Sequence, residues 1–238
     1  MTHHWFGGSW VYGDELEDTK LAYPYIVSKY FDVECKNHAV NASSIQHMLI
    51  QFKQAIFEPG DTAFFGLTSE DRNYVYDTHL YYSANLLKDY RIDLELNKHW
   101  YKYFDSPQQR QHSIASTLDL LKAYCVALDV TPYFYNTFTV SSYNCLLLEN
   151  KDWLIDPAEC LANEILHIID NDYYDVVTKD QHWIKESDWR IHEPLVHKYI
   201  RPNYAHPNSL GHQMLSKKLI NLYSELGALK YSNKLEDR

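Results

Sequence analysis

The sequence predicts a single α/β domain in which helices cover both faces of a parallel β-sheet. Its 238 residues suit one large domain better than two small ones. Short apolar runs that resemble buried strands alternate with longer runs whose apolar residues recur at helical spacing. This alternation is typical of parallel sheets, because parallel strands need long crossover connections, which helices usually supply.

Four apolar runs are predicted as strands: 3–6, 32–35, 62–65 and 131–135. Three longer patterns are predicted as helices. The first carries Ile45, Met48, Leu49, Phe52 and Ile56 after Ser43 and Ser44, which offer an N-cap; the second carries Ile114, Leu118, Leu121 and Leu128; the third carries Leu210, Met214, Leu215, Leu219 and Leu222.

Three segments fit this alternation less well. Residues 73–108, rich in Tyr, Lys and Asp, are interpreted as a helical insertion. Residues 145–200 are interpreted as short elements and loops over the sheet, and the segment after Gly227 as a polar C-terminal tail. We expect all of them to belong to the one domain, 1–238.

Composition excludes several classes of function. Lys and Arg number 22 against 32 Asp and Glu, and the resulting charge of −10 argues against nucleic-acid binding. No run approaches the roughly 20 apolar residues of a membrane helix, and the start, MTHHWFGGSW, lacks the regions of a secretory signal. The four cysteines form no CxxC pair, so free thiols in the cytoplasm are expected.

The first predicted strand runs into Gly7, Gly8 and Ser9. Ligands of parallel α/β sheets sit at the carboxyl ends of the strands. Two glycines permit a tight strand-to-helix turn that would expose the Ser9 hydroxyl there, as in a nucleophile elbow. Taken alone, the pattern favours a Gly-Gly loop with a capping serine.

The segment from Phe6 to Ser44, together with NYAHPNSLGH at 203–212, resembles the opening and closing blocks of the SGNH (GDSL-like) hydrolases. In that family a strand enters Gly-Asp-Ser and an acidic loop, and a Trp-Pro or similar pair begins the next helix, where this chain has Tyr23-Pro24. The closing block of the family is Asp-x-x-His, which matches Asn203 and His206. Pro207 fixes His206 at the entrance of a helix.

The resemblance implies a flavodoxin-like α/β/α sandwich of about five parallel strands, and a serine hydrolase that acts on a carboxylic ester. Ser9 would be the nucleophile and His206 its base, oriented by Asn203. The oxyanion would be held by the amides of Ser9 and Ala42 and by the Thr68 hydroxyl. No metal or organic cofactor is required, and an O-acetyl group on a carbohydrate is one candidate substrate.

Four positions depart from the family pattern: Gly8 replaces Asp, Ala42 replaces Gly, Thr68 replaces Asn and Asn203 replaces Asp. Because no acidic residue stands beside His206 between 198 and 211, we expect a neutral hydrogen-bond acceptor to orient the imidazole. The departures leave two alternatives open, a binding module for carbohydrate or protein that has lost turnover, and an O-acyltransferase that uses the same residues. The sequence does not indicate the oligomeric state.

Overall fold

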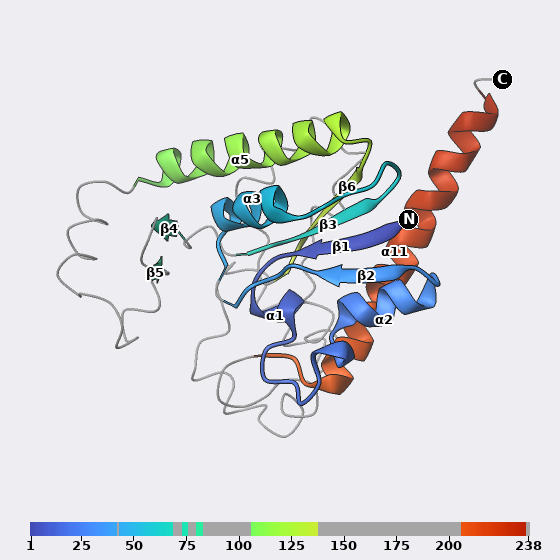
Figure 1. Ribbon diagram of the computed structural model, residues 1–238, viewed down its shortest axis with the longest axis horizontal. Helices are drawn as coiled ribbons and strands as arrows, with labels where there is room; N and C mark the ends of the chain where they lie inside the picture. The colour runs from blue at the N-terminus through green and yellow to red at the C-terminus, as the bar shows by residue number, and fades with distance from the viewer. Residues whose placement is uncertain (42, 69–72, 76–79, 83–105, 138–205, 237–238) are drawn as a thin grey trace, which may run out of the picture.

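The fold was examined in a computed structural model of the 238-residue chain (Figure 1). It describes residues 1–41, 43–68, 73–75, 80–82, 106–137 and 206–236. The predicted elements within 145–200, and the site residues Ala42 and Asn203, lie outside these ranges.

The centre of the fold is a parallel four-stranded sheet in the order β2-β1-β3-β6. Its strands are β1 (Thr2–Phe6), β2 (Glu34–Asn37), β3 (Thr62–Leu67) and β6 (Thr131–Asn136), and they confirm the four predicted strands. Trp5 is paired with Asn37 on one side and with Phe64 on the other. About five strands were expected; the described residues contribute four to this sheet.

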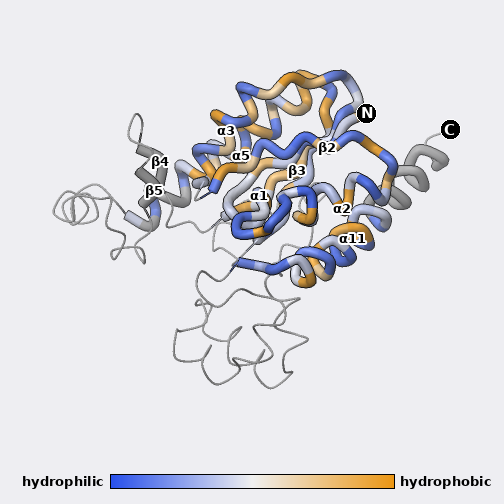
Figure 2. Tube along the Cα trace, turned by 60° about the horizontal axis from the view of Figure 1, so that its bottom comes forward, coloured by the Kyte–Doolittle hydropathy of each residue, from blue (hydrophilic) through white to orange (hydrophobic). Residues whose placement is uncertain are grey.

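Helices cover both faces of the sheet, which confirms the three-layer sandwich (Figure 1). One face carries α3 (Ile45–Gln54) and α5 (Pro107–Ala127), and the other carries α2 (Tyr23–Tyr30) and α11 (Ser209–Glu236). The rotated view in Figure 2 again places the sheet between these two pairs. No helix among the described residues is long and apolar enough to cross a membrane.

The alternation of side chains along β1 divides the core into two clusters. His3 and Trp5 face α2 and α11, where Trp5 stacks on Phe64 at a ring-centroid distance of 4.1 Å. His4 and Phe6 face the other side, where Phe6 packs with residues of α3 and α5. Successive strand residues point to opposite faces, so a strand such as β1 that is buried throughout requires helices on both sides.

The helix boundaries follow local capping chemistry. The Ser44 hydroxyl accepts a hydrogen bond from the His47 amide at 3.2 Å and caps α3, as the sequence predicted. Pro24 lies in the first turn of α2, where its missing N–H costs nothing. At the start of α11 the Asn208 side chain accepts from the amides of Leu210 and Gly211, each at 3.0 Å.

The predicted helical insertion at 73–108 is wrong at its beginning. Residues β4 (Asn73–Val75) and β5 (Leu80–Tyr82) form an antiparallel pair. Tyr and Val favour strands over helices. The helix prediction rested on the polar composition of the segment, although its apolar residues do not recur at helical spacing. At the other end, α11 continues to Glu236, so the segment after Gly227 extends this helix.

Buried imidazoles are an unusual property of this core. His3 is fully buried, and desolvation by burial, followed by the nearby His4, lowers its pKa to about 4. Desolvation also lowers the pKa of His212 to about 3. These side chains are neutral in the native protein near pH 7, whereas an unfolded chain protonates each of them near pH 6.5.

The stability of the fold should therefore fall on mild acidification. Below about pH 6.5 the unfolded chain binds a proton at His3 that the native protein does not bind until about pH 4, so the free energy of unfolding decreases across this window. Each such proton contributes at most about 1.4 kcal/mol per pH unit. Urea unfolding of the wild type and His3→Phe between pH 7 and 4 measures this contribution. The variant should have a shallower slope, and equal slopes would contradict the assignment.

Candidate active site

Ser9 lies at the carboxyl end of β1, as the first residue of the short helix α1 (Ser9–Tyr12). Gly8 is extended and caps this helix, and its carbonyl accepts from the amides of Val11 and Tyr12. Gly13 ends the helix in the left-handed region, with φ 83°, and donates its amide to the Ser9 carbonyl at 2.9 Å. The turn therefore holds Ser9 at both ends. The residue is only 2% exposed, so the expectation of an exposed Ser9 hydroxyl is wrong.

Two glycines let α1 lie directly on the sheet. A Cβ on Gly7 would overlap the Val11 side chain, and a Cβ on Gly66 would lie 2.6 Å from Val11 Cγ2 and 2.9 Å from the Tyr135 hydroxyl. Neither distance is compatible with a normal side-chain contact. The position of Ser9 thus depends on glycine at the end of β1 and within β3.

The loop that follows β2 braces the same turn. The Asn37 side chain donates to the Val11 carbonyl at 2.8 Å and accepts the Ala39 amide at 3.2 Å. The Val40 amide donates to the Gly7 carbonyl at 3.1 Å. This loop therefore contacts the backbone on both sides of Ser9.

His206 stands just before α11, close to the acidic loop after α1. Its Nδ1 lies 3.3 Å from Glu15 Oε2 and 3.9 Å from Asp14 Oδ2. The imidazole is 15% exposed, and the two carboxylate side chains are 21% and 25% exposed. The Glu15 contact has ion-pair distance without hydrogen-bond alignment, and catalytic contacts are often loose until substrate binds.

The backbone of the acidic loop holds its carboxylates in place. Glu15 adopts φ 65°, a left-handed conformation that is uncommon for a residue with a Cβ and tends to occur at functional sites. The Asp14 amide donates to the Ser9 carbonyl at 3.0 Å, and Asp14 Oδ2 accepts from the Asn41 side chain at 2.6 Å. A short, fixed loop therefore connects Ser9 to the carboxylates that face His206.

The expectation of a neutral acceptor for His206 stays a prediction, because Asn203 lies outside the described residues. Among the described residues, the Glu15 carboxylate lies close to His206 although the two residues are far apart in the sequence. The expectation considered only the acids adjacent to His206 in the chain. The available signal was the acidic Gly13-Asp14-Glu15 segment directly after the nucleophile turn, because the loops at the carboxyl edge of a parallel sheet meet in space.

The remaining predicted site residues are only partly described. Thr68 directly follows β3 and is 2% exposed at the same edge of the sheet. Ala42 and Asn203 lie outside the described residues, so their roles stay predictions. The separation of Ser9 Oγ from the His206 imidazole, expected to be about 4 Å, also stays a prediction.

His212, six residues after His206, has a structural role in holding the start of α2. It is fully buried, and its Nδ1 accepts the Tyr23 amide at 3.2 Å, which secures the first turn of α2. In the part of the chain that the structure describes, no three His, Cys, Asp or Glu side chains converge to hold a metal ion.

Comparisons with solved structures identify the fold. The chain superposes on a protein assigned to the G-D-S-L lipolytic family from Desulfitobacterium hafniense DCB-2 with a TM-score of 0.52 and 9% identity, covering 93% of this chain and 99% of that one. It superposes on the YxiM protein of Bacillus subtilis with a TM-score of 0.52 and 14% identity, covering 95% of this chain and 56% of that one.

The resemblance to SGNH hydrolases inferred from the sequence is therefore confirmed at the level of the fold. Fold similarity at this identity does not itself define an activity. No family model matches the sequence, and a search of curated proteins gave no match either.

The packing around α1 makes a direct prediction for Gly7. Gly7→Ala should reduce the free energy of unfolding by roughly 1–3 kcal/mol, the usual cost of forcing a methyl group into a packed site. The same substitution in a Val11→Ala background should cost less, because the overlapping methyl group is then absent. Urea unfolding of the four proteins measures the difference. An equal cost in both backgrounds would show that contact with Val11 is not the reason why position 7 requires glycine.

Proposed function

We propose that this chain is a serine hydrolase that cleaves a carboxylic ester, with Ser9 as nucleophile, His206 as general base and Glu15 as the carboxylate that orients His206. The observation that carries the proposal is the 3.3 Å contact between Glu15 and His206, made from the loop directly after the Ser9 turn. A nucleophile, a base and an orienting acid are the three parts of a catalytic triad, which is defined by geometry and role.

The Glu15 carboxylate would supply the negative charge near His206 that a neutral Asn203 lacks. Glu15 near Nδ1 favours the tautomer that carries its proton on that nitrogen, and this leaves Nε2 as an acceptor for the Ser9 proton. The carboxylate also stabilises the imidazolium that forms during attack. A neutral Asn203 could supply the orientation but not this charge.

The reaction would proceed through an acyl-enzyme. Ser9 Oγ attacks the ester carbonyl while His206 takes its proton, and the oxyanion is held by the amides of Ser9 and Ala42 and by the Thr68 hydroxyl. Collapse of the intermediate breaks the bond to the alcohol, which receives the proton from His206. Water, activated by His206, then releases the acid and restores the Ser9 hydroxyl.

The substrate proposed for first study is an O-acetyl group on a carbohydrate, as the resemblance to SGNH hydrolases suggests. A sugar hydroxyl in place of water would turn the same chemistry into acyl transfer. We propose a cytoplasmic location, which the free thiols of Cys35 and Cys125 support. The net charge of −10 argues against nucleic acid as a partner.

Ester turnover tests the proposal. The wild type should hydrolyse p-nitrophenyl acetate with a burst of nitrophenol, and Ser9→Ala should abolish both burst and turnover with unfolding unchanged. Ser9→Ala removes one oxygen from a buried turn whose hydrogen bonds are made by the backbone. Turnover that survives in Ser9→Ala would refute the nucleophile, and a folded wild type without turnover on acetyl esters would favour a binding module.

A second test concerns Glu15. Glu15→Gln keeps the size of the side chain and removes its charge, so kcat should fall at least about tenfold while KM changes little.

The matched control for this test is Glu17→Gln, which removes the same charge from an exposed position in the same loop. It should retain the wild-type kcat. Equal behaviour of the two variants would mean that Glu15 acts only through the net charge of the loop, and would overturn its role beside His206.

A further inference from the structure

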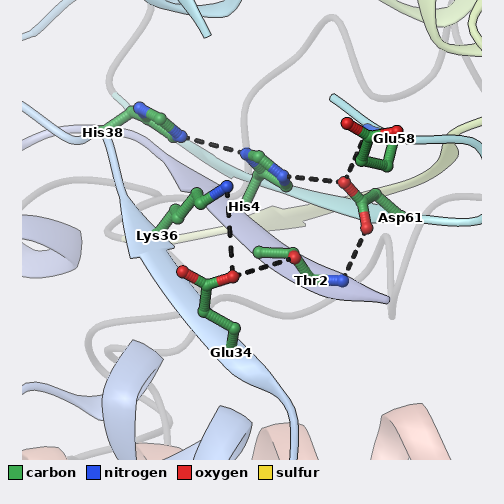
Figure 3. A network of polar contacts seen from close by, with 7 residues as sticks. All are labelled: Thr2, His4, Glu34, Lys36, His38, Glu58 and Asp61. Atoms are coloured by element: carbon green, nitrogen blue, oxygen red, sulfur yellow. Dashed lines mark hydrogen bonds and ion pairs between the residues drawn. The ribbon is translucent and has the colours of Figure 1, made fainter. Parts of the chain in front are cut away.

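A partly buried chain of polar groups lies on the face of the sheet that is covered by α3 (Figure 3). His4, in the middle of β1, is fully buried. Its Nε2 lies 3.1 Å from Asp61 Oδ2, and its Nδ1 lies 3.0 Å from His38 Nε2. Asp61 also accepts the amides of Glu58 at 2.9 Å and Thr2 at 2.6 Å. We call Asp61, His4 and His38 the relay.

The direction of each hydrogen bond in the relay follows by elimination. Burial alone would raise the pKa of Asp61, but the amides of Glu58 and Thr2 and the His4 ring outweigh it and lower the pKa, so Asp61 is an ionised acceptor. His4 must therefore donate through Nε2. Burial lowers the pKa of His4, which leaves its Nδ1 unprotonated, and His38 must donate to it through Nε2.

The relay joins the two edges of the sheet. Asp61 directly precedes β3, at the edge where the strands begin, and His38 directly follows β2, at the edge that carries Ser9. The His38 ring stacks on Phe6, with a ring-centroid distance of 4.9 Å and an interplanar angle of 9°. The ring is thus fixed by one hydrogen bond in its plane and by an aromatic contact on its face.

The loop that carries His38 contacts the nucleophile turn on both sides of it. Asn37 donates to the Val11 carbonyl, and Val40 donates to the Gly7 carbonyl. Asn41 donates to Asp14, next to the carboxylate that faces His206. Asn41, which precedes the proposed oxyanion donor Ala42, is therefore hydrogen-bonded to the acidic loop of the site.

We propose that the relay holds the loop 37–41 in register with the nucleophile turn, and that His38 is a positioning residue of the active site. The part of this inference that concerns turnover rests on the proposed ester hydrolysis, whereas the holding of the loop does not. Loss of the His38 donor would leave His4 Nδ1 buried without a partner and would free the loop to move relative to Gly7.

Protonation of His4 is the event that would break the relay, since two N–H groups would then face each other. Burial, and to a lesser extent Lys36, oppose the cation on His4, whereas Asp61 and Glu34 favour it. Burial, then His4, then Lys36, lower the pKa of His38 to about 4. The relay is therefore intact at neutral pH.

The experiment compares His38→Phe with His38→Gln. Phe keeps the stack on Phe6 and has no donor, whereas the Gln amide can donate to His4 Nδ1. His3→Phe is the control, because His3 is as buried as its neighbour His4 on β1 but faces the opposite side of the sheet. Hydrogen exchange of the Val40 amide, relative to the amides of β3, measures how firmly the loop is held.

In His38→Phe the Val40 amide should exchange at least tenfold faster relative to β3, and in His38→Gln and His3→Phe it should keep the wild-type ratio. Nitrogen-15 spectra of the wild-type rings should show His4 protonated at Nε2 alone. An unchanged Val40 ratio in His38→Phe, or a proton on His4 Nδ1, would overturn the relay.

Turnover separates this inference from the proposed function. On p-nitrophenyl acetate, His38→Phe should lower kcat at least fivefold with KM unchanged, and His38→Gln should restore it. If kcat is unchanged while Val40 exchange is faster, the relay holds the loop but His38 does not position the site. If the wild type has no turnover, the proposed function and the positioning role fail together, and the exchange ratio alone decides whether the relay holds the loop.

Discussion

The contact on which the site depends is that of Val11 with two glycines. Val11 packs against Gly7 and Gly66 so closely that neither position has room for a Cβ. This seats α1 directly on the carboxyl edge of the sheet, and Ser9 at its first position has no freedom to move away. The carbonyl of Val11 then becomes the acceptor for Asn37, which ties the next loop to the same turn.

Two polar systems extend from this contact. On the solvent side, Gly13 turns the chain so that Glu15 reaches His206, and a base from the C-terminal part of the chain meets an acid from the N-terminal part. On the face of the sheet covered by α3, the relay connects the beginnings of the strands to the loop that contacts Gly7. In both systems, polar groups that are partly or fully buried face one another, which offsets the free-energy cost of removing them from water.

Much of the fold could be predicted because β1 and β3 are buried on both faces and α3 begins at a recognisable cap, Ser44. Asn73–Val75 and Leu80–Tyr82 were misassigned because short polar strands carry little periodicity. Ser9 and His206 were recognisable through local Gly-Gly-Ser and His-Pro-Asn patterns. Glu15 and His38 were missed because their partners, His206 and His4, are distant in sequence, and only the sheet order brings them together.

The central claim is that Ser9 is a nucleophile activated by His206 and Glu15. Intact-mass measurement after exposure to a fluorophosphonate, followed by peptide mapping, tests it without knowledge of the natural substrate. The account predicts one phosphonate adduct, located on Ser9, which forms more slowly in Glu15→Gln and not at all in Ser9→Ala. A folded protein that takes up no adduct, or takes it up at another serine, would contradict it.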